Sequence, residues 1–211
     1  MRYSEMKALE QRRAARRGHA PLSPGAAGNR MPWWMFLVIG LVLLLLAACS
    51  SPVYRDTTVT MQTNGPVNID RYQGLWYEIA RFPNRFEEGC VGVTAEYSRN
   101  PDGTIKVVNT CREGTLDGPV DVVEGIATAA LPEADRLEVS FVPWLPFAKG
   151  DYWILFTDYE VAVVGTPSGS VGWVLARTPT LPPERLEAAY DVLRRNGYDL
   201  SRITLTLQPP A

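Results

Sequence analysis

The sequence predicts an all-β barrel or sandwich that is followed by one helix and a short last strand. From Trp76 to Arg177, short runs of β-branched and aromatic residues are separated by clusters of turn residues. The turns recur at intervals close to the roughly 8 to 12 residues typical of such folds. We count eight runs, at 75–80, 91–98, 104–111, 120–128, 136–142, 151–157, 160–165 and 171–177.

The alternation in the run 91–98 indicates which of its faces is buried. Val93, Ala95 and Tyr97 point to one side of an extended strand, and Glu96 points to the other. A glutamate in a dry interior would carry a large desolvation cost. We therefore expect the valine face to line the interior.

The run 151–157 has apolar residues on both faces. Tyr152, Ile154 and Phe156 alternate as an inward face would, but Trp153 and Leu155 between them are apolar too. The orientation of this strand stays open, and a strand covered on both faces fits if a helix packs outside it.

The segment after the runs supplies such a helix. From Glu184 to Asn196 the apolar residues follow helical spacing, with basic residues in the last turn and Gly197 placed to end the helix. Beyond it, residues 203–207 alternate as a final strand.

Residues 1–30 are basic and lack the periodic apolar residues that could pack a core. Seven Lys or Arg against two Glu give about +5, which leaves about −7 from Cys49 onward. We expect 1–30 to be a disordered extension, or the product of a misplaced start codon. The acidic remainder argues against nucleic acid as a partner.

Residues 31–48 carry no charge and end in small residues before Cys49. A basic flank, an apolar stretch and a small-residue end describe a secretory signal, whereas about 18 apolar residues would also just span a bilayer. The tetrapeptide Leu46-Ala47-Ala48-Cys49 resembles the lipobox of bacterial lipoproteins. That resemblance implies cleavage before Cys49 and an anchor of several acyl chains on this residue, which would hold the protein stably on its membrane.

Ser50 follows the lipidated position and, by the same resemblance, favours the outer membrane over the inner one. The domain would then lie in the periplasm. Residues 49–66 are polar with Pro and Gly, so we expect a lipidated tether there and the folded domain over 67–211.

The two cysteines other than Cys49 fit one hairpin. The runs 91–97 and 104–110 flank the turn 100–103, Asn-Pro-Asp-Gly. In a hairpin, the numbers of two paired residues add up to a constant, which pairing across this turn sets at 203. Cys90 and Cys111 add up to 201, so the sulfurs would lie nearly opposite each other. We expect a disulfide if the compartment is oxidising, and two buried free thiols if the chain stays in the cytosol.

Three motifs, in order, resemble those of the lipocalin family, in the form found in bacterial and apolipoprotein D-like members. Segment 68–81, NIDRYQGLWYEIAR, resembles the G-x-W element with Gly74 and Trp76. Thr157-Asp158-Tyr159 resembles the second element, between strands six and seven, and Arg177 the third, after strand eight. The resemblance covers about 65–210 and implies an eight-stranded antiparallel up-and-down β-barrel with one C-terminal α-helix and a short final strand.

The resemblance gives these motif residues a structural role. Trp76 would close one end of the barrel, and Arg177 would lie across its ring in a cation–π contact of roughly 0.5 to 2 kcal/mol. Gly74 is also explained by close approach of the chain at a corner.

A barrel of this size is filled by its own side chains or holds one small ligand, and strand number does not decide between them. The lipocalin resemblance implies binding and storage or transport of a fatty acid or lysophospholipid. Arg81 or Arg85 would meet its headgroup, unless both are solvated loop charges. Loop residues 144–147 are equally explained by packing on their own barrel or by membrane contact. The candidate ligand contacts are Val93, Ala95, Tyr97, Phe82, Phe86, Phe141, Trp144, Tyr152, Ile154 and Phe156.

The expected domain has no histidine, since His19 is the only one in the chain. It therefore lacks the commonest general base, zinc ligand and haem ligand. We expect no catalytic residue, metal, cofactor or enzymatic activity, and we expect Glu87 and Glu88 to be solvated. A lipocalin-fold enzyme that modifies bound lipid and a filled-barrel structural lipoprotein are the alternatives, and formation of a homodimer stays open.

Overall fold

The computed structural model describes residues 52–142, 145 and 148–210. The expectations for the segments 1–30 and 31–48, for lipid on Cys49 and for ligand contact by Trp144 lie outside the described residues. In those described ranges, no helix combines the length and the apolar character needed to span a bilayer.

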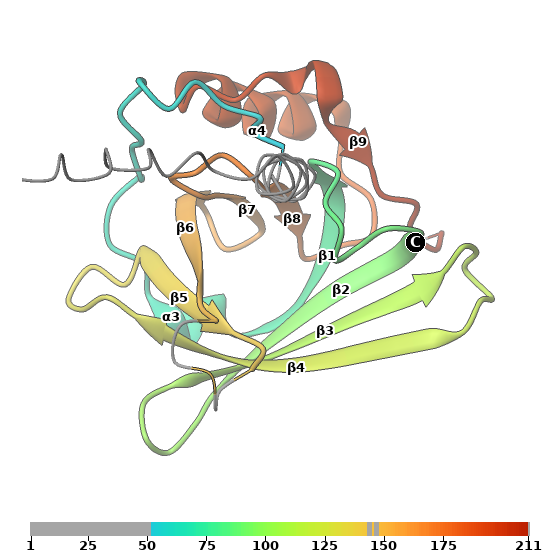
Figure 1. Cartoon of the computed structure of the whole chain (residues 1–211), viewed down its shortest axis with the longest axis horizontal. Coiled ribbons are helices and arrows are strands. Elements are labelled where there is room, and N and C mark those ends of the chain that lie inside the picture. The colour runs from blue at the N-terminus through green and yellow to red at the C-terminus, as the bar shows by residue number, and fades with distance from the viewer. Residues whose placement is uncertain (1–51, 143–144, 146–147, 211) are drawn as a thin grey trace, which may run out of the picture. The chain divides into compact units, whose positions relative to one another are not determined.

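The strands form one sheet that closes on itself. Strands β1 to β8 are each antiparallel to the next along the chain, and β1 pairs with both β2 and β8 to complete a barrel (Figure 1). The short β9 (Thr204–Leu205) is added outside β1. The barrel is confirmed over the sandwich, and its strands are β1 (Gly74–Arg81), β2 (Cys90–Arg99), β3 (Ile105–Glu113), β4 (Val120–Ala129), β5 (Arg136–Ser140), β6 (Gly150–Thr157), β7 (Val161–Gly165) and β8 (Gly172–Ala176).

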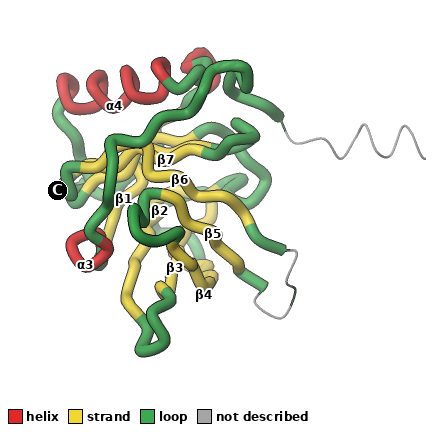
Figure 2. The backbone as a smooth tube through the Cα atoms, turned by 90° about the vertical axis from the view of Figure 1, so that its left-hand side faces the viewer, coloured by secondary structure: helices red, strands yellow, loops and turns green. Residues whose placement is uncertain are grey.

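Helix α4 (Pro183–Arg195) packs on the outside of the barrel against β6 and β7 (Figure 2). Pro183 suits the first turn because the amide hydrogen that proline lacks would have no helical partner there. The helix buries Ala189, Val192 and Leu193. The helix predicted at 184–196 is thereby confirmed, and the 3-10 turn η1 (Leu200–Arg202) leads from it to β9.

The connections of the barrel gather at two ends. One end, which we call the closed end, holds the one-turn helix α3 (Ile69–Tyr72) and the connections 100–104, 130–135 and 158–160. The other, which we call the open end, holds the loops 82–89, 114–119 and 166–171 and the described residues of the connection between β5 and β6.

Two apolar clusters occupy the two sides of the sheet. The inner cluster fills the closed half of the barrel and includes Trp76, Tyr97, Val107, Ile154 and Leu175. The outer cluster lies between the sheet and α4 and includes Phe82, Leu155, Val163, Val174 and Leu193. Strands β6, β7 and β8 are therefore covered on both faces, as the apolar run 151–157 required.

The residues that precede the barrel pack along its outer side. Tyr54 and Arg55 are buried, and the amide of Val67 donates to the main-chain oxygen of Glu133 at the closed end. The guanidinium of Arg55 donates to three main-chain oxygens, those of Asn196, Pro167 and Val59. The composition of 49–66 predicted a tether. From Tyr54 onward the chain is instead fixed to the barrel, because its polar groups find partners there that are remote in sequence.

Replacing Arg55 with alanine leaves these oxygens without their donor. We expect Arg55→Ala to lower the free energy of unfolding by about 2 to 3 kcal/mol, measured by urea denaturation. Arg99→Ala is the matched control, since it removes a half-exposed ion pair with Asp70 and should cost less than about 1 kcal/mol. Equal losses in the two variants would show that Arg55 is not a structural anchor.

Candidate ligand-binding site

Trp76 forms the floor of the barrel. Its indole is fully buried, and its Nε1 donates to the main-chain oxygen of Tyr72 at 2.8 Å. The guanidinium carbon of Arg177 lies 3.8 Å from the centre of the Trp76 ring. The cation–π contact expected from the sequence is therefore present at the closed end.

Arg177 also fastens the chain that enters β1. Its Nη1 donates to Leu75 O at 2.8 Å and its Nη2 to Gln73 O at 2.8 Å, while its Nε donates to Tyr159 O at 3.1 Å. Gly74 has a φ of +91° beside this guanidinium, a conformation that other residues rarely adopt. The arginine thus joins the start of β1 to the connection between β6 and β7.

The second motif builds that connection. The Asp158 carboxylate accepts the amides of Glu160 at 3.0 Å and Val161 at 2.8 Å, and the Thr157 hydroxyl donates to Val161 O at 3.0 Å. Burial would raise the pKa of Asp158, but these hydrogen bonds and Arg185 outweigh it and lower the pKa. Tyr159 adopts a φ of +75°, and the guanidinium of Arg71 lies 3.8 Å from its ring centre. The motif residues therefore stabilise the closed end.

Three tyrosine hydroxyls meet inside the barrel near Trp76. Tyr152 lies in the middle, 3.0 Å from the Tyr72 oxygen and 2.8 Å from the Tyr97 oxygen. Burial raises the pKa of Tyr97 to about 12 and the pKa values of Tyr72 and Tyr152 well above 10. All three hydroxyls are therefore neutral at physiological pH, as an apolar interior requires.

The inner face becomes more exposed toward the open end. Register pairs Trp76 with Ala95, Ala95 with Asn109 and Asn109 with Val123, so these four side chains share the inner face. Trp76 is fully buried, whereas Val123 is 43% exposed. Phe141, which lies over Gly125 of β4, is 39% exposed. The barrel is therefore packed at its closed half and exposes apolar side chains at its open half.

Four of the residues that we expected to contact a ligand face the barrel interior. Ala95, Tyr97, Tyr152 and Ile154 belong to the inner cluster or pack against it. Val93 is buried beside a β-bulge in β2.

Phe156 does not face the interior. A β-bulge between Ile154 and Phe156 places Leu155 and Phe156 both in the outer cluster, because an added residue reverses the alternation. Phe156 instead lines a 300 Å³ cavity under α4. The inward direction predicted for it is wrong.

Phe82 also differs from its expected place at the mouth. It is fully buried in the outer cluster, with its ring centre 4.9 Å from that of Tyr54 and 5.1 Å from that of Tyr198. These two partners come from segments remote in the chain, so local sequence did not reveal them. Phe86, four residues later, is 83% exposed on the rim of the open end.

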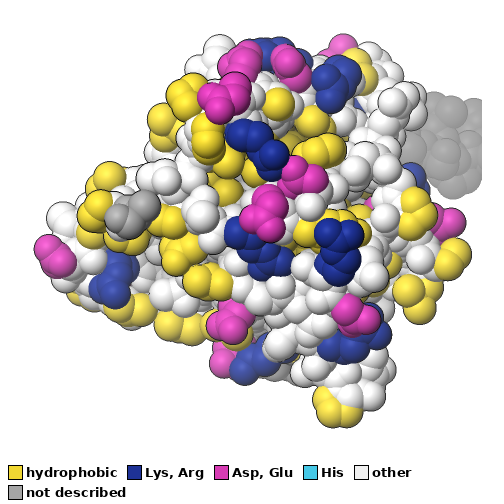
Figure 3. All heavy atoms as spheres, turned by 180° about the vertical axis from the view of Figure 1, so that it is seen from behind, with side chains coloured by type: hydrophobic (Ala, Val, Ile, Leu, Met, Phe, Trp, Pro, Cys, Tyr) yellow, Lys and Arg dark blue, Asp and Glu magenta, His cyan; other side chains and the backbone are white. Residues whose placement is uncertain are grey.

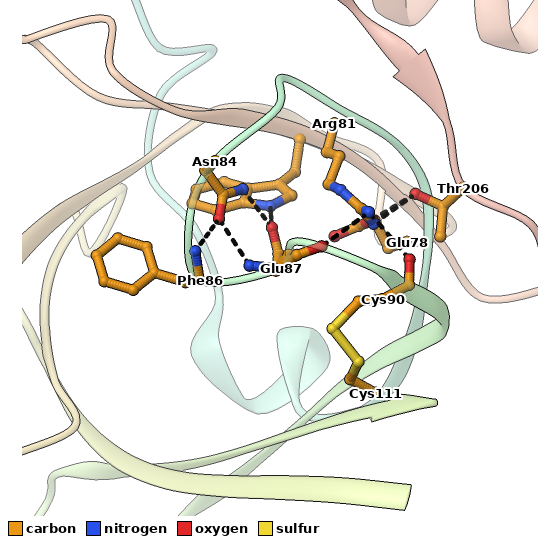
Figure 4. The surroundings of a disulfide bond; sticks show 9 residues. Glu78, Arg81, Asn84, Phe86, Glu87, Cys90, Cys111 and Thr206 are labelled. Atoms are coloured by element: carbon orange, nitrogen blue, oxygen red, sulfur yellow. Dashed lines mark hydrogen bonds and ion pairs between the residues drawn. A yellow bond between two sulfur atoms is a disulfide. The ribbon is translucent and has the colours of Figure 1, made fainter. Parts of the chain in front are cut away.

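A contact between an arginine and a buried carboxyl group, which the sequence did not reveal, lies near the open end (Figure 4). A bulge in β1 turns Glu78 and Arg81 to the same inner face, and Arg81 Nη1 lies 2.6 Å from Glu78 Oε1. Burial, followed by the negative charge of Glu87, raises the pKa of Glu78 to about 8, and the Thr206 hydroxyl donates to the same oxygen. Alternation from Trp76 would have placed Glu78 inside, since it lies two residues along the strand.

Arg81 and Glu87 also fix the loop 82–89 at the open end, which we call the rim loop. Arg81 Nη2 donates to the main-chain oxygens of Glu87 at 3.1 Å and Cys90 at 2.9 Å. Trp173, on the inner face of β8, donates to the Glu87 carboxylate at 3.1 Å. Glu87 is therefore not the solvated charge that we expected, because an indole and a side-chain amide bind its carboxylate.

A cavity of 520 Å³ opens between the rim loop, Pro52 and the loop 166–171. Arg81 and Glu87 line it, so this cavity reaches the polar groups described above. Arg85 lines it too and is exposed, which keeps this side chain available for an anion.

The disulfide between Cys90 and Cys111 joins the open-end part of β2 to β3. The Cα atoms are 5.4 Å apart. The numbers of the residues that pair across β2 and β3 add up to 204 from Arg99 to Thr94 and to 203 at Cys90. A bulge at Gly92 and Val93 causes this change of register. The expected bond is thus confirmed. In the described part of the chain, no group of three or more His, Cys, Asp or Glu side chains is placed to hold a metal ion.

The raised pKa of Glu78 gives the protein a specific pH dependence. Between pH 4.5 and about 8 the folded protein keeps a proton that the unfolded chain has lost, so stability falls as pH rises through this window. We expect Glu78→Gln to remove a slope of up to about 1.4 kcal/mol per pH unit in urea denaturation. Glu138→Gln, at an exposed ion pair with Lys149, should keep the slope. An unchanged slope in Glu78→Gln would assign it to another group.

Comparison with known proteins agrees with the motifs and the barrel. Residues 67–208 match the family model described as a lipocalin-like domain. Temperature-induced lipocalin-1 of Arabidopsis thaliana is 40% identical over 67% of this chain and 80% of its own length. Apolipoprotein D of Mus musculus is 36% identical over 77% and 84%, and outer membrane lipoprotein Blc of Escherichia coli K12 is 38% identical over 78% and 91%.

Solved structures share the fold at lower identity. Lobster apocrustacyanin A1 aligns with a TM-score of 0.56 at 19% identity, over 68% of this chain and 81% of its own. Insecticyanin of Manduca sexta aligns with a TM-score of 0.54 at 20% identity, over 74% and 86%. Together with the closed barrel and the contact of Arg177 with Trp76, these matches show that the chain belongs to the lipocalin family.

Proposed function

We propose that this lipocalin binds a fatty acid or a lysophospholipid in its barrel and stores or transports it in the cell envelope, held to the outer membrane by lipid on Cys49. The observation that carries the proposal is the change in exposure along the inner face. Trp76 is fully buried at the closed end, and Val123 is 43% exposed near the open end. An apolar chain that enters from the open end would cover these exposed side chains.

The energetics allow such a complex. Burial of a chain of 14 to 16 carbons contributes on the order of 10 kcal/mol at about 0.8 kcal/mol per CH₂, against an association cost of at least about 4 kcal/mol. At the low end of the association cost, this balance leaves about 6 kcal/mol or slightly more, which corresponds to a dissociation constant of about 1 to 50 μM. The family supports a hydrophobic ligand, and the resemblance to bacterial lipocalins implies a fatty acid or a lysophospholipid.

A headgroup would lie at the open end. Arg81 already binds Glu78 and two main-chain oxygens, whereas Arg85 is exposed on the same loop beside the 520 Å³ cavity. Arg85 is therefore the better partner for a carboxylate or phosphate.

The outer-membrane location has two supports. Residues 46–49 have the lipobox pattern, and a relative at 38% identity carries the name outer membrane lipoprotein Blc. The disulfide fits an oxidising compartment such as the periplasm.

Two neighbouring residues of β4 provide a matched test of binding inside the barrel. Val123 faces inward and is 43% exposed, while Val122 faces outward and is 51% exposed. We expect Val123→Trp to obstruct the open half of the barrel and to weaken the affinity for fatty acid at least tenfold, measured by displacement of a fluorescent fatty acid. The affinity of Val122→Trp should stay within about twofold of the unaltered protein. Equal effects would place the ligand elsewhere.

The same assay separates the alternatives for the unaltered protein. Absence of binding by long-chain fatty acid and lysophospholipid would favour a barrel filled by its own side chains. Mass spectrometry of the recovered lipid would reveal new products if the protein were an enzyme.

The proposed anchor is tested by Cys49→Ser in the full chain. We expect this variant to move from the membrane fraction to the soluble fraction, because its acyl chains are lost. The double variant Cys90→Ser with Cys111→Ser should stay with the membrane, which controls for the loss of cysteine. An intact mass equal to that of a chain that begins at Cys49 and carries acyl groups would support the anchor. Membrane retention of Cys49→Ser would contradict it.

A further inference from the structure

The N-terminal segment is fastened to the open end of the barrel. The amide of Tyr54 donates to Gly169 O at 2.7 Å, and its hydroxyl donates to Pro83 O at 2.5 Å. Arg55 Nη1 donates to Pro167 O at 2.7 Å. All three acceptors belong to the loops 82–89 and 166–171, so the point where the chain leaves the barrel is fixed on the rim.

The distance from this point to Cys49 is short. Cys49 lies three residues before Pro52, and a fully extended chain of that length reaches about 10 Å. Pro52 itself lines the rim cavity together with Phe86. A lipid on Cys49 would therefore enter its bilayer within about 10 Å of the rim.

The barrel is longer than this reach. Strand β2 runs from the open end to the closed end over 10 residues. Such a strand is about 33 Å long, or about 25 Å along the axis of a barrel with tilted strands. A barrel standing on its closed end would hold Pro52 too far from the bilayer for Cys49 to insert its acyl chains.

Exposed apolar side chains favour the same end. Phe86, Val53 and Leu207 lie at the rim, and Val120 and Val122 lie where β4 leaves it. Figure 3 shows hydrophobic side chains gathered on the projecting part at its left, where β3 and β4 reach the open end. The closed end exposes Leu131 and Leu75. Exposed aromatic and aliphatic groups of this kind insert at a membrane interface.

Charge does not set this orientation. Exposed Arg85 lies on the loop 82–89 with exposed Glu88, and the partly buried Arg81 lies beside Glu87. The rim is therefore not a basic surface, and the tether and the apolar side chains act alone.

We infer that the open end of the barrel faces the bilayer that holds the Cys49 lipid, with Phe86 in the lipid interface. The inference rests on the proposed lipid anchor. A fatty acid or lysophospholipid then moves between the bilayer and the barrel along the loop 82–89 and does not cross open water.

Two residues at opposite ends provide a matched test. Phe86 is 83% exposed at the open end and Leu131 is 80% exposed at the closed end. Phe86→Cys and Leu131→Cys each introduce one free thiol, since Cys90 and Cys111 are bonded and Cys49 would be acylated. The full-length lipoprotein is labelled with a nitrobenzoxadiazole fluorophore and reconstituted in phosphatidylethanolamine and phosphatidylglycerol vesicles that contain doxyl-labelled lipid.

We expect at least threefold stronger doxyl quenching at Phe86→Cys than at Leu131→Cys, and the same result for Val53→Cys. Equal quenching at the two ends, or stronger quenching at Leu131→Cys, would overturn the orientation even if the protein floats with the vesicles and binds fatty acid. If the full-length protein does not float with the vesicles, both the proposed lipid anchor and the orientation are contradicted. Loss of fatty acid binding with the quenching contrast intact would contradict the ligand proposal alone.

Discussion

The contact between Arg177 and Trp76 is the interaction on which the rest of the site depends. The guanidinium covers the indole and binds the main-chain oxygens of the chain that enters β1. It thereby seals the closed end with groups that are all hydrogen-bonded, which a buried polar layer requires. Because this end is sealed, the exposed apolar side chains of the inner face lie toward the open end.

The sequence predicted the barrel and its closing residues because both leave short-range signals. Alternation with a period of two identified the inward side of β2, and turn residues separated the strands. The same rule failed at Phe156, since one inserted residue in β6 reverses the faces without changing composition. A bulge in β1 likewise brings Glu78 and Arg81 to one face, although they are three residues apart.

Contacts between segments far apart in the chain left no such signal. Phe82 was expected at the mouth, and its two aromatic neighbours come from 28 residues before it and 116 residues after it. Arg55 lies in a segment whose composition is that of a linker, yet main-chain oxygens of remote loops fix it. The position of the N-terminal segment on the rim is therefore a property of the folded molecule that composition does not encode.

The polar contacts at the open end order the loop 82–89 more than they stabilise the folded protein. The contact between Arg81 and the Glu78 carboxyl group contributes little net free energy, because burial opposes ionisation of Glu78. Arg81 nevertheless binds the main-chain oxygens of Glu87 and Cys90, and Trp173 binds the Glu87 carboxylate. These contacts hold the loop 82–89 in one conformation next to the Cys90 disulfide. Since ordering a loop opposes binding, a rim that is already ordered lowers the free-energy cost of taking up a ligand there.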